Sequence, residues 1–282
     1  MKILGKTATL IMLILFFVSL CVLMYPSVSQ YWNSHVQTKA VAEYNEMLAA
    51  MNKEDYTALF DRAREYNRRL FELEKPLSQF RVVEGYEQCL NPGGDGIMGY
   101  IDISKIGVEL PIYHTTRDSV LAVGVGHLEG TSLPAGGESS HCGLSAHRGL
   151  PNAKLFTDLD RLEVGDTFVL NILGEVLTYQ VDKISVVNPD QVEGLAIEEG
   201  RDFCTLITCT PYGINTQRLL VRGTRIETVQ YKKIFVTTEA YIIDRLIVTP
   251  AVALPILFVL IMIVIFKPAK KKPKFGPNGE LL

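Results

Sequence analysis

Two apolar runs, one near each end of the chain, constrain the fold more than any other feature. Residues 8–25, ATLIMLILFFVSLCVLMY, carry no charge, and neither do residues 246–266, LIVTPAVALPILFVLIMIVIF. Each run is about long enough to cross the apolar core of a bilayer as a helix. The first also has features of a signal peptide, but YPSVSQYW (25–32) offers only a weak cleavage site. We therefore predict two flanking transmembrane helices, the first an uncleaved anchor within residues 1–27.

Basic residues beside these runs predict the orientation. KPAKKKPK (267–274) follows the second run, and Lys2 and Lys6 precede the first. The positive-inside rule then places both termini, including the basic tail 267–282, in the cytoplasm. The segment between the runs is predicted to be extracytoplasmic and held in the cell membrane at both ends. A soluble core with two buried helices is the alternative, but runs of this length without charge disfavour it.

Composition limits what the exported part does. The net charge of −3 gives no reason to expect a nucleic-acid partner. Four cysteines lie between the apolar runs, Cys89, Cys142, Cys204 and Cys209, which is too few for a disulfide scaffold of this size, although one pair could form. The exported part is long enough to build its own core.

Two helices are predicted between the first apolar run and residue 75. Apolar residues at Val41, Tyr44, Leu48 and Met51 predict a helix over 36–51. A second helix is predicted over about 53–74. Together they form a helical hairpin that packs on the main domain or spaces it from the membrane.

The boundary details of the second helix can also be predicted. Asn52 is a candidate N-cap, and Glu65 with Arg69 forms an i,i+4 pair. Pro76 ends the helix. Residues 28–93 are thus predicted as a helical segment followed by an irregular linker.

From residue 94 the pattern changes to short strands separated by turns. Gly174 lies between two alternating runs and predicts a tight hairpin. One helix is predicted over 152–162. Many short strands at close spacing indicate a barrel or sandwich. The predicted strands are 98–103, 108–114, 121–128, 142–148, 167–173, 175–187, 204–210 and 218–226.

Cys209 is the best candidate for chemistry. It ends the apolar run CTLITC (204–209), just before the turn TPYG (210–213), so its thiol is accessible. A free thiol is only about 3% thiolate at pH 7 and needs a cationic or basic neighbour to act as a nucleophile. Cys204 starts the same run, points to the opposite face of a regular strand, and is better explained as a small buried hydrophobe.

Two residues could activate such a thiol. His147 ends the run CGLSAHR (142–148) at the start of a loop, a better setting than those of the other four histidines, and His141 is predicted to be a solvated loop residue. Arg218 opens the strand after the turn and could stabilise a thiolate or an oxyanion. Taken alone, each is equally compatible with an ordinary strand-end residue.

A metal site and a cofactor are not predicted. Cys142, Cys209, His141 and His147 are zinc-ligand types, but the chain has no C-x2-C or H-x3-H pair to fix two ligands locally. Adjacent His141 and Cys142 would also point to opposite sides of a strand.

Several motifs in order resemble the class C, pilin-polymerising sortases of Gram-positive bacteria. TLITC (205–209) matches the T-L-x-T-C signature, and CTPYGINTQRLLVRG (209–223) resembles its class C form. GDGIMGYIDISKIGVELPIYH (94–114), GLSAHRG (143–149) and LFTDLDRLEVGDTF (155–168) resemble the start of the catalytic domain, its histidine motif and the segment that follows.

The resemblance implies a mainly β fold, an eight-stranded sortase-type barrel with short helices over 94–228. A linker (229–245) would join it to the second membrane helix. Within it, Cys209 would be the nucleophile, His147 the general acid/base and Arg218 the stabiliser of the oxyanion and substrate. Thr208 would shape the substrate groove.

The same resemblance implies a reaction and partners. The thiolate would cleave an LPXTG-like sorting signal between Thr and Gly, and a pilin lysine would resolve the thioacyl enzyme, building a covalent pilus. Anchoring of surface proteins to cell-wall precursor is the alternative acceptor chemistry. A catalytically silent, membrane-tethered binding protein is a third reading that the intact Cys-His-Arg set disfavours.

Two departures from the class C pattern bear on regulation. Class C enzymes usually carry a lid with an Asp-Pro-aromatic motif over the cysteine. Residues 70–96 contain no Asp-Pro and offer only KPLSQF (75–80) as a remote substitute, and Gln217 stands where many class C sequences have histidine. The sequence therefore predicts an atypical lid.

Overall fold

A computed structural model describes residues 2–228, and residues 1 and 229–282 lie outside the description. The second predicted membrane helix, the linker and the basic tail therefore fall on undescribed residues. The chain divides into two compact units, one of which, Val28–Lys232, contains the barrel. That unit is described by itself.

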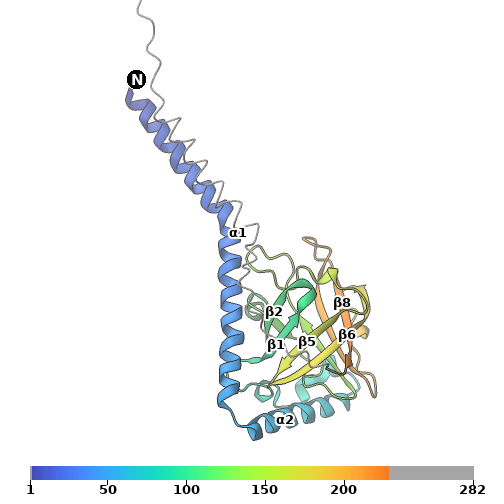
Figure 1. Ribbon diagram of the computed structural model, residues 1–282. Helices are drawn as coiled ribbons and strands as arrows, with labels where there is room; N and C mark the ends of the chain where they lie inside the picture. Colours follow the sequence, from blue (N-terminus) through green and yellow to red (C-terminus); the bar gives the residue numbers. More distant parts are fainter. Residues whose placement is uncertain (1, 229–282) are drawn as a thin grey trace, which may run out of the picture. The chain divides into compact units, whose positions relative to one another are not determined.

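The eight strands close into one mixed barrel (Figure 1), as predicted. The order around the barrel is β1-β2-β3-β4-β7-β8-β6-β5. β2 runs parallel to β3 and β4 parallel to β7, whereas the other neighbours are antiparallel. The strands are β1 (Ile97–Ile103), β2 (Val108–Tyr113), β3 (Val125–His127), β4 (Ser140–Ser145), β5 (Thr167–Ile172), β6 (Glu175–Val187), β7 (Asp202–Thr210) and β8 (Gln217–Ile226).

Apolar side chains from alternate strand positions fill the barrel. Phe168 and Tyr179 stack in it with ring centroids 5.6 Å apart, and both are buried. The predicted hairpin between β5 and β6 is confirmed: Ile172 pairs with Glu175, and Leu173 and Gly174 both have positive φ. Positive φ at two central residues is the geometry of a tight two-residue turn, which explains the glycine.

Three sequence predictions in this region need correction. The third strand begins only at Val125, because residues 118–121 form a helical turn, α4 (Asp118–Leu121). The fourth strand ends at Ser145, so His147 lies in the loop that follows. The helix predicted over 152–162 is absent: Leu155 has φ +41°, which a right-handed helix cannot contain, and only the 3-10 turn η4 (Leu159–Arg161) forms there.

The two N-terminal helices pack on the barrel as expected. α1 (Lys2–Ala50) buries Val41, Tyr44 and Leu48, and α2 (Lys53–Phe71) lies across one end of the barrel (Figure 1). The Tyr44 hydroxyl donates to Met98 O at 2.9 Å and accepts from Leu173 N–H at 2.8 Å. A side chain of α1 thereby joins β1 to the turn between β5 and β6.

The helix boundaries are partly as predicted. Asn52 occupies the N-cap position of α2 but makes no side-chain cap bond, and the pair between Glu65 and Arg69 forms at 2.8 Å. α1 is one continuous helix that includes Pro26, so the first apolar run and the helix predicted over 36–51 belong to the same helix. One proline removes a single backbone hydrogen bond, which a membrane helix tolerates.

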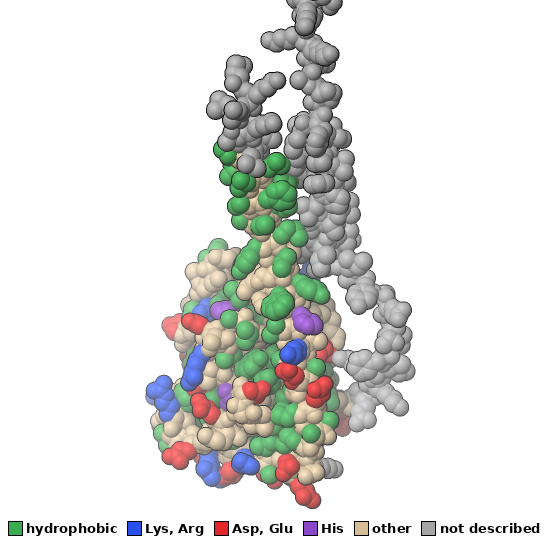
Figure 2. Space-filling view, turned by 90° about the vertical axis from the view of Figure 1, so that its left-hand side faces the viewer, with side chains coloured by type: hydrophobic (Ala, Val, Ile, Leu, Met, Phe, Trp, Pro, Cys, Tyr) green, Lys and Arg blue, Asp and Glu red, His purple; other side chains and the backbone are tan. Residues whose placement is uncertain are grey.

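One described helix is long and apolar enough to cross a membrane. Its span, Leu13–Ala50, lies near the N-terminus and has a hydropathy of 1.9 in its most apolar window. Figure 2 shows hydrophobic side chains over this helix and mixed Lys, Arg, Asp and Glu over the barrel unit. A signal sequence would satisfy the same criterion, so the helix is consistent with either reading of the first apolar run.

Between α2 and β1 the chain crosses the barrel surface in short turns. It forms α3 (Pro76–Gln79), η1 (Phe80–Val82) and η2 (Tyr86–Gln88). Two further 3-10 turns are η3 (Ser104–Ile106) and η5 (Glu193–Leu195), the latter in the long loop between β6 and β7.

Candidate active site

β7 and β8 place Cys209 and Arg218 directly opposite each other. They are register partners in this antiparallel pair. Side chains of opposed residues point to the same face, with Cβ atoms about 4.5–5.5 Å apart. Both residues are half-buried. Arg218 Nη1 donates to Asn215 O at 3.2 Å and to Gln217 O at 3.0 Å, so the loop between the strands holds the guanidinium.

His147 arrives from the other neighbour of β7. β4 runs parallel to β7 and pairs with it as far as Ser145 and Ile207. Ala146 N–H then donates to Ile207 O at 3.1 Å, which continues the alignment into the loop. The half-buried His147 is the next residue, so it lies near the end of β7 that carries Cys209. The three predicted residues thus belong to the same end of β4, β7 and β8.

Two separate apolar clusters identify the two faces of β7. Cys204 and Leu206 belong to the main core inside the barrel, whereas Ile207 belongs to a smaller cluster with Leu195 and Leu220. Because strand residues alternate, Cys209 lies on the same face as Ile207. We call this face, built from the outward-facing positions of β4, β7 and β8, the outer face.

Thr208 points away from the outer face. It is 1% exposed, and its hydroxyl donates to Ala146 O at 2.8 Å. The bond joins the residue before Cys209 to the residue before His147. In this structure Thr208 shapes the site by holding two strands in register and does not line the surface.

The loops that follow β4 and β7 also touch. The Tyr212 ring packs on Gly149, where an added Cβ would lie only 3.0 Å from the ring, and the Arg148 guanidinium lies 5.7 Å from its centroid. Arg148 also forms an ion pair with Asp160. These contacts brace the His147 loop against the loop that leads to Arg218.

The segment after α2 covers part of the outer face. Leu77 packs against the cluster of Leu195, Ile207 and Leu220. A Cβ on Gly130 would lie 2.7 Å from Leu77 Cα, so only glycine permits this approach. Ile207 and Leu220 are register partners one layer from Cys209 and Arg218. A cavity of about 570 Å³ separates the segment from the loop between β6 and β7.

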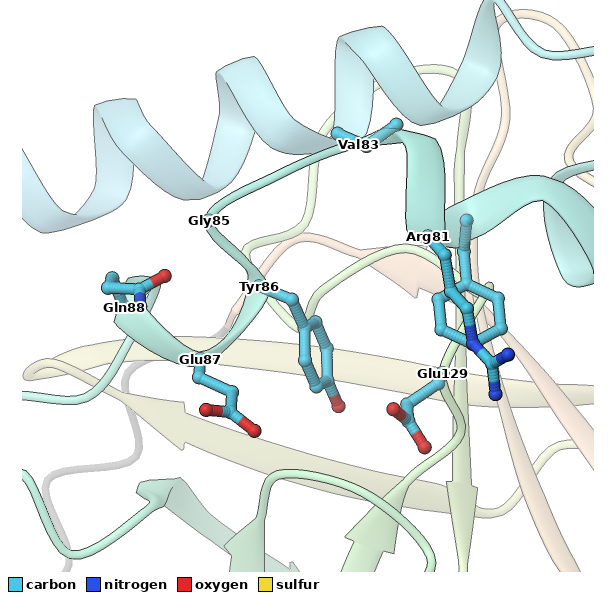
Figure 3. Close-up of a pocket in the computed structure, with 8 residues that line it drawn as sticks. Arg81, Val83, Gly85, Tyr86, Glu87, Gln88 and Glu129 are labelled. Atoms are coloured by element: carbon cyan, nitrogen blue, oxygen red, sulfur yellow. The ribbon is translucent and has the colours of Figure 1, made fainter.

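Tyr86 fastens the same segment to the barrel. Figure 3 shows its ring pointing between the side chains of Glu87 and Glu129. Its hydroxyl donates to His127 Nδ1 at 2.9 Å and accepts from Thr115 N–H at 3.0 Å. The His127 Nε2–H donates to Ser132 O at 2.9 Å, which leaves Nδ1 free to accept. Burial raises the pKa of Tyr86, so the phenol stays protonated.

The burial of the remaining histidines and cysteines was predicted only in part. His114, His127 and His141 are all buried, so the prediction of a solvated His141 is wrong. The cause is the loop between β6 and β7, which covers the end of β4. Cys89, Cys142 and Cys204 are buried free thiols, which confirms the prediction for Cys204, the one of the three whose burial was argued from the sequence. Within residues 2–228, no three His, Cys, Asp or Glu side chains gather to hold a metal ion.

The comparisons with known proteins point to the same family. The family model described as "Sortase domain" matches residues 101–226. The crystal structure of sortase C1 from Streptococcus agalactiae is 46% identical, with a TM-score of 0.62, over 67% of this chain and 99% of that one. Sortase C from Clostridium perfringens, solved with a C-terminal cell wall sorting motif, is 42% identical, with a TM-score of 0.60, over 68% and 100%.

More distant relatives match over less than half of the chain. Sortase D of Bacillus subtilis is 30% identical over 131 residues, which are 45% of this chain and 63% of that protein. Sortase A of Bacillus anthracis is 28% identical over 132 residues, 47% of this chain and 61% of that protein. The chain thus spans less than two thirds of the length of these two relatives.

Proposed function

The chain belongs to the sortase family, with the class C enzymes as its structural neighbours, and from this membership we propose that it is a pilin-joining cysteine transpeptidase. The observation that carries the proposal is the meeting of Cys209, Arg218 and His147 at one end of three adjacent strands. A nucleophile, an acid/base and an anion stabiliser on one face are what acyl transfer needs.

The first half-reaction is acylation of Cys209. Its thiolate attacks the threonine carbonyl carbon of an LPXTG-like sorting signal, and Arg218 donates hydrogen bonds to the oxygen that gains negative charge. His147 gives a proton to the glycine nitrogen as the C–N bond breaks. The products are a thioester on Cys209 and a free glycine amine.

The second half-reaction transfers the acyl group. A lysine amine of the next pilin attacks the thioester carbonyl, and His147 accepts the proton that the amine loses. The C–S bond breaks, the thiolate returns, and an isopeptide bond joins the two pilins. No oxidant, metal or cofactor enters this balance.

The outer-face cluster is the proposed site for the apolar residues of the sorting signal. Ile207 and Leu220 lie one layer from Cys209, and Leu195 completes an apolar surface beside them. Leu77 occupies this surface in the structure, so the segment that carries it must move before the signal binds. We propose that residues 72–90 act as the lid.

The test is an intact-mass measurement. The full chain in detergent is incubated with an LPETG-containing peptide, and a thioacyl adduct is expected on wild type but not on Cys209→Ala. Cys21→Ala is the matched control, because that thiol lies in the apolar run of α1, outside the barrel and the proposed lid, and its variant should still acylate. An adduct that persists in Cys209→Ala would contradict the proposal.

The acceptor is tested separately. The class C structures are 39–46% identical to this chain, against 28–29% for the Sortase A relatives, which favours a pilin lysine over cell-wall precursor. Mass spectrometry of the product junction from cells that carry this enzyme as their single sortase should show a lysine isopeptide. A peptidoglycan stem at the junction would establish the anchoring function instead.

The membrane arrangement is part of the proposal. The catalytic barrel, 94–228, would be extracytoplasmic, with a membrane helix before it and another over 246–266, and both termini cytoplasmic. A membrane-impermeant amine reagent applied to intact protoplasts should modify lysines of the barrel and spare the tail 267–282. Modification of the tail at the same rate would overturn this topology.

A further inference from the structure

A hydrogen bond from β4 holds the loop between β6 and β7 in place. The loop, residues 188–201, brings Leu195 to the outer-face cluster through η5. The next residue, Ala196, accepts a hydrogen bond at its carbonyl from the ring of His141, which lies on β4. A loop that helps to form the proposed binding surface is therefore held at the residue beside its apolar contact.

His141 uses both ring nitrogens. Nδ1 lies 2.8 Å from Ala196 O, and Nε2 lies 2.7 Å from Thr205 Oγ1. A carbonyl oxygen only accepts, so Nδ1 carries the proton, and Nε2 then accepts from the Thr205 hydroxyl. One neutral tautomer satisfies both partners, although the ring is 1% exposed.

The surroundings favour that neutral form. Burial lowers the pKa of His141 most, and Arg222 lowers it further, while the hydrogen bond to Ala196 O and the charges of Glu198 and Asp182 raise it by less. Arg222 stacks 4.1 Å above the ring centroid of Phe203, which packs 5.5 Å from the His141 ring. The imidazole is thus a neutral hydrogen-bonding group at neutral pH.

The strand that carries His141 leads into the loop of the proposed acid/base. Cys142 and Leu144 point into the core, so His141 lies on the outer-face side of β4, and His147 follows in the loop two residues past the end of the strand. Thr205 and Cys209 are four positions apart on β7 and also share that face. His141 therefore connects the two catalytic strands to the loop across one surface.

We propose that His141 is a positioning residue for the sorting signal, which fixes the loop carrying Leu195 against the strands that present Cys209. This inference rests on the proposed function. A leucine at position 141 would fill the space, but it would supply neither the donor for Ala196 nor the acceptor for Thr205. The hydrogen bond from His141 to Ala196 O, and not the volume of the side chain at position 141, therefore determines the position of Leu195.

A matched pair of variants separates the two hydrogen bonds of His141, one to Ala196 and one to Thr205. In His141→Asn the short amide places an N–H close to the position of Nδ1 and keeps the bond to Ala196. In His141→Gln the longer amide reaches the position of Nε2 and keeps Thr205, but it leaves the loop unanchored. Both variants are neutral and polar, so a general loss of packing would affect them alike.

The measurement is steady-state turnover of an LPETG peptide by the full chain in detergent, with hydroxylamine as the amine. His141→Gln should raise KM about 3- to 10-fold, the effect expected for losing one hydrogen bond. Its kcat should stay within about 2-fold of wild type, because Cys209, His147 and Arg218 are untouched. His141→Asn should keep KM within about 2-fold. Equal KM increases in the two variants, or a fall in kcat at constant KM, would overturn the proposal.

Hydrogen exchange gives a readout independent of catalysis. Amides of residues 193–197 should exchange faster in His141→Gln than in wild type, whereas His141→Asn should match wild type. Unchanged protection in His141→Gln would refute the anchor even if turnover changed. If wild type forms no thioacyl adduct, the proposed function fails, and exchange alone decides whether the anchor exists.

Thr205→Val supplies a second route if the His141 variants fail to fold. It removes the hydroxyl that selects the tautomer and leaves the His141 side chain in place. Exchange at 193–197 should again increase, with a smaller rise in KM than in His141→Gln. No change in either quantity would contradict the role assigned to the tautomer.

Discussion

Shortening Leu77 should open the proposed lid. Leu77 is half-buried against Leu195, Ile207 and Leu220. Leu77→Ala removes three carbon atoms, at about 0.8 kcal/mol for each fully buried methylene. Half burial reduces the total to about 1.2 kcal/mol, which shifts the opening equilibrium by a factor of about 8. We expect a thiol reagent to modify Cys209 about 8-fold faster in Leu77→Ala than in wild type.

The assay is a time course of alkylation of the full chain in detergent, read at Cys209 by peptide mapping. Mapping separates this thiol from Cys21, which is exposed, and from the three buried cysteines. Val82→Ala is the control, since Val82 lies in the same segment but is 74% exposed and should leave the rate unchanged. Equal rates in wild type and Leu77→Ala would refute the reasoning, and so would equal acceleration in both variants.

Three further perturbations test other parts of the structure. Thr208→Val should lower kcat for peptide acylation by up to about 10-fold, because it deletes the buried bond to β4, whereas Thr208→Ser should retain activity. Gly99→Ala should cost about 3 kcal/mol of unfolding free energy in denaturant titrations, because its Cβ would lie 2.3 Å from a backbone carbonyl oxygen of β5. Hydrogen bonds from Arg68 and Arg69 lower the pKa of Glu65 to about 2. The stability this carboxylate contributes is therefore present above its unfolded pKa and lost as pH falls toward 2. NMR should show the low titration midpoint, and Glu65→Gln should remove that part of the pH dependence.

The sequence correctly predicted the elements that are determined by residues close together in the chain. The alternation along β5 and β6 and the glycine between them correctly gave the hairpin at Gly174. β7, which ends one residue after Cys209, and β8, which begins one residue before Arg218, likewise follow from a short turn between two apolar runs. Parity along β7 correctly separated Cys204, in the core, from Cys209.

Long-range packing determined what the sequence did not show. His141 follows two serines, which suggested a solvated loop, but a segment about fifty residues later in the chain covers it. Leu77 belongs to a stretch without helical or strand periodicity, so nothing local indicates that it reaches the outer face. Leu155 lies in a pattern that favours a helix, yet its backbone adopts a left-handed conformation that the loop after His147 requires.

Closure of the barrel limits the ways in which a peptide substrate can bind. β7 pairs with β8 from Phe203 to Thr210 and with β4 from Asp202 to Ile207, so the backbone N–H and C=O groups of most of the strand are already used. A sorting signal therefore cannot bind by adding a strand to the nucleophile's strand, as many extended peptides do at open sheet edges. Recognition must depend on side-chain pockets and on the guanidinium of Arg218. For the proposed enzyme we therefore expect the side chains that precede the scissile bond, more than the substrate backbone, to determine which signal is accepted.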